Sequence, residues 1–250
     1  MDRLREKVRN LLKEGKVAGY LGYIMKDGHP LPHLFTSKNP EEVDQAIVAP
    51  GDARYPLDKV LQQLAKGYPD ATFAVQVRGC DERGLNELYK WGQLDPEKVV
   101  LVGIACPQDQ ADYCECFGPW PSVIDSGDKC EPVLRSKRVD RIDALPGEAA
   151  FQEWIAAFNK CVKCYGCRDI CPMCFCKECA LEHPDLMSTG KVPPDSIFQL
   201  VRAIHMAGRC IDCGLCEENC PADIPLRVLY KKGSFPFMAS GRARAMEAPA

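Results

Sequence analysis

Hydrophobic residues at the start of the chain recur with the spacing of one helical face. Leu4, Val8, Leu11 and Leu12 are separated by charged and polar residues, and residues spaced in this way lie on one side of an α-helix. The pattern predicts an amphipathic helix that ends at Gly15. The same segment lacks the apolar core of a signal peptide, so we expect a cytoplasmic protein.

Two continuous apolar runs further along the chain are typical of buried strands. Residues 72–77 read TFAVQV and residues 99–104 read VVLVGI, both short and rich in β-branched residues. Between them, residues 82–92 carry apolar side chains at helical spacing. A strand, a helix and a strand in so short a stretch imply a right-handed crossover and parallel strands. We therefore predict an α/β domain with a parallel sheet over residues 1–148.

The end of this domain is indicated by a change in composition. Residues 125–148 are polar and are interrupted by prolines and glycine, as linkers often are, and we place the boundary near residue 148. A second domain then covers residues 149–236, in which residues 195–206 predict a helix with Ile197, Leu200, Val201 and Ile204 on one face. Residues 237–250 are expected to form a tail.

Composition excludes several classes of protein. The chain has 250 residues, with 32 Lys and Arg against 35 Asp and Glu, and it lacks the concentrated basic surface that nucleic-acid binding requires. No segment approaches the roughly 18 apolar residues of a transmembrane span. The unusual value is the 16 cysteines. A chain of this length does not need a disulfide framework to build a core, so reduced thiols at this density indicate metal sites.

Eight of the cysteines form two copies of one motif. Residues 161–172 read CVKCYGCRDICP and residues 210–221 read CIDCGLCEENCP. In bacterial-type ferredoxins, the first three thiolates of such a run hold one [4Fe–4S] cluster and the fourth ligates the other cluster. Zinc sites instead use cysteine pairs separated by a dozen or more residues. We therefore predict an α+β ferredoxin-like domain with two clusters, the first held by Cys161, Cys164, Cys167 and Cys220 and the second by Cys210, Cys213, Cys216 and Cys171.

The other eight cysteines are enough for two further sets of four ligands. Three of them open an insertion at residues 172–209, and five lie in the first domain. Cys80 and Cys106 follow the two predicted strands, at the edge where open α/β sheets bind ligands. Free cysteine is also a common core residue, so the alternative is that these thiols are simply buried. Counting favours two more clusters, one held by Cys80, Cys174, Cys176 and Cys179 and the other by Cys106, Cys114, Cys116 and Cys130.

Other chemistry has little support in the sequence. His29, His33, His183 and His205 have no metal-ligand spacing, and the chain contains no G-x-S-x-G or H-E-x-x-H motif. No glycine-rich phosphate loop of the form G-x-G-x-x-G or G-x-x-x-x-G-K-[ST] occurs either. We therefore predict no catalytic residue. Cations that flank the cluster loops are interpreted as solvated surface charges, with tuning of the cluster potentials as the alternative; they are Lys160, Lys163, Arg168 and Arg209.

The cysteine motifs and their surroundings resemble one known family. RGCDER at residues 78–83, LDPEKVVLVGIACP at 94–107 and the two ferredoxin runs are similar to segments of the beta subunits of coenzyme F420-reducing hydrogenases and formate dehydrogenases. The resemblance covers most of residues 70–230. It implies an anaerobic iron–sulfur subunit, often a flavoprotein, inside a complex with a hydrogenase, formate dehydrogenase or heterodisulfide-reductase-type partner. Flavin-bearing members have a glycine-rich helix start near the N-terminus, which residues 1–30 lack here.

Two functional classes are compatible with these features. In the first, the chain is a non-catalytic electron-transfer subunit that relays single electrons through [4Fe–4S] clusters. In the second, it is a catalytic subunit in which FAD exchanges a hydride with F420 or a nicotinamide and passes single electrons to the clusters. FAD would then bind at the strand edge near Cys80 and Cys106. Because cluster ligation by those thiols would occupy this edge, we favour the electron-transfer subunit.

Overall fold

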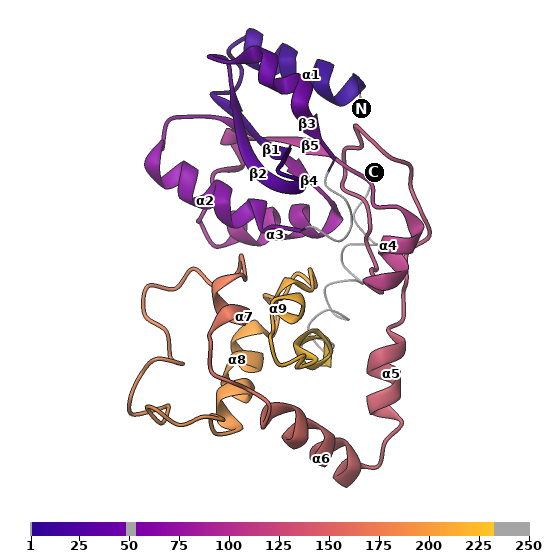
Figure 1. Cartoon of the computed structure of the whole chain (residues 1–250), viewed down its shortest axis with the longest axis vertical. Coiled ribbons are helices and arrows are strands. Elements are labelled where there is room, and N and C mark those ends of the chain that lie inside the picture. The colour runs from indigo at the N-terminus through magenta and orange to yellow at the C-terminus, as the bar shows by residue number, and fades with distance from the viewer. Residues whose placement is uncertain (1, 49–53, 233–250) are drawn as a thin grey trace. The chain divides into compact units, whose positions relative to one another are not determined.

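The computed structural model of the chain describes residues 2–48 and 54–232 (Figure 1). It contains two compact units, of which the first spans Met1–Leu134 and the second begins at Arg135. The boundary that we predict near residue 148 falls at the start of a helix of the second unit, and the predicted tail at 237–250 lies outside the described residues. No helix in the described ranges combines the length and apolarity needed to cross a membrane.

The first unit is built on a mixed sheet in which the predicted strands are parallel neighbours. β4 pairs in parallel with β5 on one side and with β1 on the other, while β1 pairs antiparallel with β2 and β3. The order along the sheet is β2-β1-β4-β5. The predicted α/β domain is therefore confirmed, with antiparallel strands added to it. The strands are β1 (Gly19–Lys26), β2 (His29–Thr36), β3 (Ala46–Ile47), β4 (Phe73–Val77) and β5 (Val99–Gly103).

The β1–β2 hairpin was not predicted from the sequence, although its turn carries a signal for it. Asp27 and Gly28 form a two-residue loop, with φ angles of 52° and 79°, and Lys26 pairs with His29. Asp-Gly between two extended runs is a strong hairpin signal because both central residues need positive φ. β2 contains Pro30 and Pro32, which are tolerated because this strand lies at the edge of the sheet.

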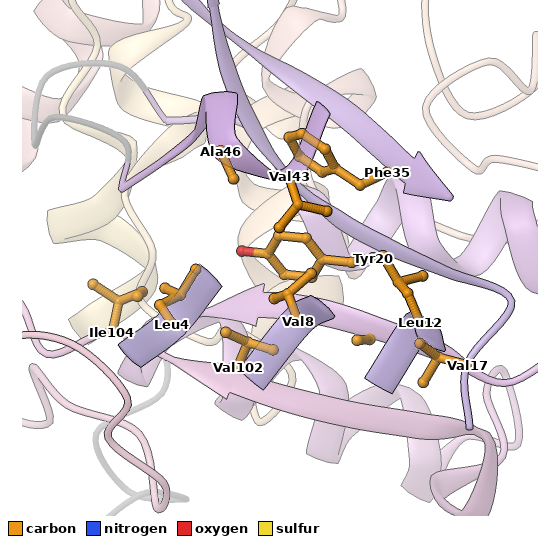
Figure 2. Close-up of a cluster of buried hydrophobic side chains, with 11 residues drawn as sticks. Leu4, Val8, Leu12, Val17, Tyr20, Phe35, Val43, Ala46, Val102 and Ile104 are labelled. Carbon is orange, nitrogen blue, oxygen red and sulfur yellow. The ribbon is translucent and has the colours of Figure 1, made fainter. Parts of the chain in front are cut away.

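Helices cover both faces of this sheet (Figure 1). α1 (Asp2–Lys13) lies on one face, and α2 (Leu57–Gly67) and α3 (Gly79–Lys90) lie on the other. Figure 2 shows the side chains of α1 directed toward residues of the strands. The predicted N-terminal helix is confirmed, and Gly15 follows it with a φ of 65°. The buried side chains of this core include Leu4, Val8, Leu12, Val17, Tyr20, Phe35, Val43 and Val102.

α3 begins earlier than the sequence predicts, and this places Cys80 in a helix instead of in a loop. The helix starts at Gly79, directly after β4, because the Asp81 carboxylate accepts a hydrogen bond of 2.8 Å from the Arg78 backbone N–H. This bond satisfies a backbone donor at the helix start. Cys80 therefore lies in the first helical turn, at the carboxyl end of β4.

Asp58 is a buried carboxyl group in α2 with an oxygen, Oδ2, that has no hydrogen-bond partner in the part of the chain described. Burial, and then the charge of Asp81, raise the pKa of Asp58 well above its usual range. The folded state therefore favours the protonated acid, and this contribution to stability is lost as the pH rises through the raised pKa.

We therefore expect Asp58→Asn to stabilise the first unit at pH 8. The gain should be largest at high pH and should shrink as the pH falls toward 4. Amide hydrogen exchange of α2 and β4, compared between Asp58→Asn and wild type at pH 8 and at pH 4, measures this gain in stability. Equal protection of the two proteins at pH 8 would contradict the prediction.

The second unit consists of helices and loops in its described part, residues 135–232, where no strand is found. The strands of the predicted α+β ferredoxin-like domain are therefore absent from that part. Prolines and left-handed residues in and around the cysteine runs interrupt any extended pairing. The helix predicted at 195–206 is present as α8. The labelled helices are α5 (Lys137–Asp143), α6 (Gly147–Phe158), α7 (Gly166–Asp169), α8 (Ile197–Met206) and α9 (Leu215–Glu218), and residues 226–232 are also helical. α4 (Gln108–Tyr113) belongs to the first unit.

Candidate iron–sulfur sites

The two ferredoxin-like cysteine runs fold into loops with the same backbone geometry. Lys163 and Asp212, each two residues after the first cysteine of its run, have φ angles of 52° and 57°. Tyr165 and Gly214, each directly after the second cysteine, have φ angles of 60° and 83°. A short helix then begins in both runs, α7 after Tyr165 and α9 after Gly214. The sequence repeat is therefore also a structural repeat.

In both loops a backbone N–H group donates to the sulfur of the first cysteine. The N–H of Lys163 lies 3.4 Å from Sγ of Cys161, and the N–H of Asp212 donates to Cys210. Successive N–H groups turned inward by left-handed residues form concavities that bind anions. The loops therefore suit the anionic thiolates and sulfides of an iron–sulfur cluster.

The four cysteines assigned to the second cluster line one pocket. Cys171, Cys210, Cys213 and Cys216 surround it together with apolar groups of Met173, Met206 and Tyr230. Burial, followed by the charge of Asp212, raises the pKa of Cys210 to about 11. The pKa of Cys216 is raised mainly by burial and then by Cys210. These thiols are therefore protonated at neutral pH without metal, and metal binding would release their protons.

The cysteines assigned to the first cluster gather around Cys167. Burial raises the pKa of this thiol, the guanidinium of Arg202 lowers it, and the thiols of Cys161, Cys220 and Cys164 raise it further. Cys220 comes from the second run, as the crossed ligation of a two-cluster ferredoxin requires. α7 and α9 pack against each other, which brings the two runs together.

The described residues contain no group of three or more His, Cys, Asp or Glu side chains that converge as they would on a single metal ion. A four-iron cluster has its ligands at separate corners of a cube, so it needs a lined cavity and not one point of convergence. The pocket of the second set has this form.

The four cysteines of the third predicted set have different surroundings and contacts. Cys174 forms a hydrogen bond with Cys171, Cys179 lies beside Arg168, and Cys176 is exposed. Cys80 belongs to the first unit, where its Sγ lies 3.8 Å from Oδ1 of Asp81. Burial, and then the Asp81 charge, raise the pKa of Cys80. This ligand set remains a prediction.

The fourth set lies within the first unit and gathers around Cys116. Burial raises the pKa of Cys106 to about 11; Arg78 opposes this shift, and Cys116 and Cys114 add to it. Cys130 is likewise affected by burial and by Cys116. The four thiols of this contiguous sequence motif are therefore neighbours in space.

Arg83, Arg168 and Arg202 each bond a cysteine sulfur. Arg168, which the sequence analysis singled out, bonds Cys179, whereas Arg83 and Arg202 were not singled out. Nη2 of Arg83 lies 3.9 Å from Sγ of Cys116, and Nη1 of Arg202 lies 3.1 Å from Sγ of Cys174. Among the cations considered earlier, Lys163 donates to the carbonyl of Ser188 and Arg209 stacks over Phe175. Arg83 lies in the RGCDER segment, close to Cys80 in the sequence, and this position could have indicated a role near the cysteines. The sequence around Arg202 contains no comparable signal.

No protein-family model matches this chain. The F420-dependent formate dehydrogenase subunit beta of Methanocaldococcus jannaschii is 48% identical over 156 residues, which cover 61% of this chain and 37% of that protein. The F420-dependent formate dehydrogenase 1 subunit beta of Methanococcus maripaludis is 55% identical over 82 residues, 32% of this chain and 21% of that protein.

A more distant match is the formate dehydrogenase iron–sulfur subunit of Haemophilus influenzae, 26% identical over 115 residues, which cover 44% of this chain and 28% of that protein. The chain thus spans well under half the length of each of these curated relatives. The matches confirm the resemblance indicated by the cysteine motifs. Over its matched residues, the chain is similar to the beta subunits of F420-dependent formate dehydrogenases.

Proposed function

We propose that this chain is the iron–sulfur electron-transfer subunit of an anaerobic multi-subunit redox complex and relays single electrons through several [4Fe–4S] clusters. The observation that carries the proposal is the repeated cysteine loop, together with the pocket lined by four thiols of the second set. Its relatives, named as formate dehydrogenase beta and iron–sulfur subunits, support the same class of function.

The residues present fit the two ferredoxin clusters. The first would be held by Cys161, Cys164, Cys167 and Cys220, and the second by Cys210, Cys213, Cys216 and Cys171. A bound [4Fe–4S] cluster supplies one-electron redox chemistry. The chain's own contribution is to hold the thiolates, to donate backbone N–H groups to their sulfurs, and to exclude water with Met173, Met206 and Tyr230.

We propose two additional clusters. The set of Cys106, Cys114, Cys116 and Cys130 is supported by the proximity of these thiols in the first unit. The set of Cys80, Cys174, Cys176 and Cys179 rests on counting and on the position of Cys174 directly after the first ferredoxin run. Four clusters would form a chain of redox centres, as electron relay requires.

Iron content tests the number of clusters. Anaerobically reconstituted protein should contain about 16 iron atoms and as many acid-labile sulfides per chain. Cys116→Ala and Cys176→Ala should each lose about four of both, whereas Val162→Ala, at an exposed position of the first loop, should keep the full number. An iron content near 12 atoms per chain would mean that only one of the two additional clusters forms. A content near 8 would mean that only the two ferredoxin clusters form.

The partner that we propose is a formate-dehydrogenase-type catalytic subunit, because two relatives carry that name. A hydrogenase or a heterodisulfide-reductase-type enzyme would be the alternative. Mixing the reconstituted chain with each purified catalytic subunit, and measuring electron transfer from formate or from hydrogen to the clusters, distinguishes them. Reduction of the clusters with formate as the donor, and no reduction with hydrogen, supports the proposal.

A flavin-dependent catalytic role is the second candidate, and the F420-dependent activity in the relatives' names favours it. FAD would bind at the carboxyl end of β4 and β5, where Arg78 and Cys106 lie. Acid precipitation of the purified complex decides between the roles. Free flavin released in proportion to this chain would favour the catalytic role, and its absence favours the electron relay.

A further inference from the structure

α8 packs with the opposite face from the one that its hydrophobic pattern predicts. Ile197, Leu200 and Ile204 are 47%, 43% and 69% exposed, whereas Gln199 and Arg202 are 1% and 2% exposed. Burying a charged group while apolar groups remain in solvent is unfavourable unless the buried group has strong partners. The orientation of α8 therefore implies partners for Gln199 and Arg202.

Those partners lie in the first ferredoxin cysteine run and directly after it. Nε2 of Gln199 donates to Sγ of Cys161 at 3.3 Å. Nη2 of Arg202 donates to the carbonyl oxygen of Cys167 at 2.7 Å, and Nη1 donates to Sγ of Cys174 at 3.1 Å. The two side chains lie one turn apart on the helix, so α8 delivers both to the cysteine region from one side.

Arg202 lies among thiols and is not paired with a carboxylate in the described part of the chain. None of the ion pairs found in the described ranges contains it, and its Nε has no hydrogen-bond partner there. The groups that act on it electrostatically are Tyr230, Cys174, Cys171 and Cys167. A buried cation among neutral thiols would carry a large desolvation cost. Thiolates that hold a cluster would supply the missing negative charge.

We propose that α8 tunes the reduction potentials of the ferredoxin clusters, with Arg202 acting on both clusters and Gln199 acting on the first. The inference rests on the proposed function and names two positioning residues for it. Arg202 contacts Cys167 of the first ligand set, and its guanidinium lies 5.7 Å from the ring centroid of Tyr230, which lines the pocket of the second set. Reduction adds a negative charge to a cluster, so a nearby positive charge or hydrogen-bond donor favours the reduced state and raises the potential.

Redox titration of the full reconstituted chain, followed by electron paramagnetic resonance, tests this inference. Arg202→Gln should make reduction of both clusters at least tenfold less favourable, which is a negative shift of about 59 mV for one electron. Arg202→Lys keeps the charge and should shift the potentials less. Gln199→Leu should lower only the potential of the cluster ligated by Cys161. Arg141→Gln, which removes an exposed cation paired with Glu153, is the matched control and should change neither potential.

Unchanged potentials in Arg202→Gln and Gln199→Leu, at full iron content, would overturn the inference and leave the proposed function intact. If wild-type protein binds no iron, the proposed function itself fails. If Arg202→Gln does not assemble clusters, the cluster potentials of Gln199→Leu and Arg202→Lys test the inference instead. A selective shift of the first cluster in Gln199→Leu upholds the inference, and no shift in either variant rejects it.

Discussion

Chelating iron from the anaerobic protein should unfold the second unit and leave the sheet of the first unit folded. The second unit carries buried polar groups, Gln199, Arg202, Asp212 and Arg227, and four of its thiols line one pocket. In such domains much of the metal-binding free energy is folding free energy. The core of the first unit is different, because the α1 helix and the strands form an apolar cluster that contains no cysteine.

Limited proteolysis and hydrogen exchange of the loaded and metal-free proteins measure this difference. Residues 160–225 should lose protection when iron is removed, while β4 and β5 should keep theirs. Cys216→Ala should lose the second cluster before the first, and Cys116→Ala should leave the protection of residues 160–225 unchanged. Full protection of residues 160–225 in metal-free protein would show that packing alone stabilises the second unit.

The cysteine loops could be predicted from the sequence because their spacing is a local property. Three cysteines with two residues between each pair leave the backbone little conformational freedom. Left-handed residues occur at matching positions in both runs, Lys163 and Tyr165 in the first and Asp212 and Gly214 in the second. β4 was predictable for a similar reason, since a strand buried on both faces is a continuous apolar run. β5 also reads as an apolar run, although it lies at the edge of the sheet and its first three residues are only half-buried. Parallel pairing then follows from the helix between the two strands.

The orientation of α8 could not be predicted in the same way. Periodicity identifies the helix and its two faces, but tertiary contacts determine which face is buried. Here the buried face combines the apolar Phe198 and Met206 with Gln199 and Arg202. The partners of these two polar side chains are cysteine sulfurs and a backbone carbonyl, while Ile204 stays exposed. The ligands of the third set could not be derived from local sequence either, because Cys80 and Cys174 are far apart in the chain and no shared motif links them.

Gly103, the last residue of β5, occupies a position where a side chain has no space. A Cβ atom there would overlap the carbonyl oxygen of Val123, lie 2.6 Å from its carbonyl carbon, and lie 3.0 Å from Cγ of Pro121. Two of these atoms belong to the backbone, so no rotamer change can relieve the clash. The segment that contains Val123 packs closely on the strand end, where the Gly103 carbonyl accepts the N–H of Asp125 at 2.8 Å.

The same segment fixes the position of Cys106. The N–H of Cys106 donates to the carbonyl of Pro119 at 2.9 Å, and the N–H of Ala105 donates to that of Ser126 at 2.9 Å. Displacing the segment would therefore move Cys106 relative to Cys114 and Cys116. The close approach at Gly103 is thus expected to be a structural requirement of the proposed fourth ligand set.

We expect Gly103→Ala to destabilise the first unit by about 3 kcal/mol, the upper part of the range for overpacking, and to lose about four iron atoms per chain. Gly79→Ala, whose Cβ would overlap the Gly118 carbonyl oxygen, should have the same effect from the other side of the segment. Gly67→Ala is the matched control, because its Cβ would meet no atom within 4 Å. Iron analysis and thermal unfolding measure both effects, while the resonance signals of the ferredoxin clusters should persist in all three variants. If Gly103→Ala and Gly79→Ala keep the iron content of the wild type despite their lower stability, Cys106 is not a cluster ligand.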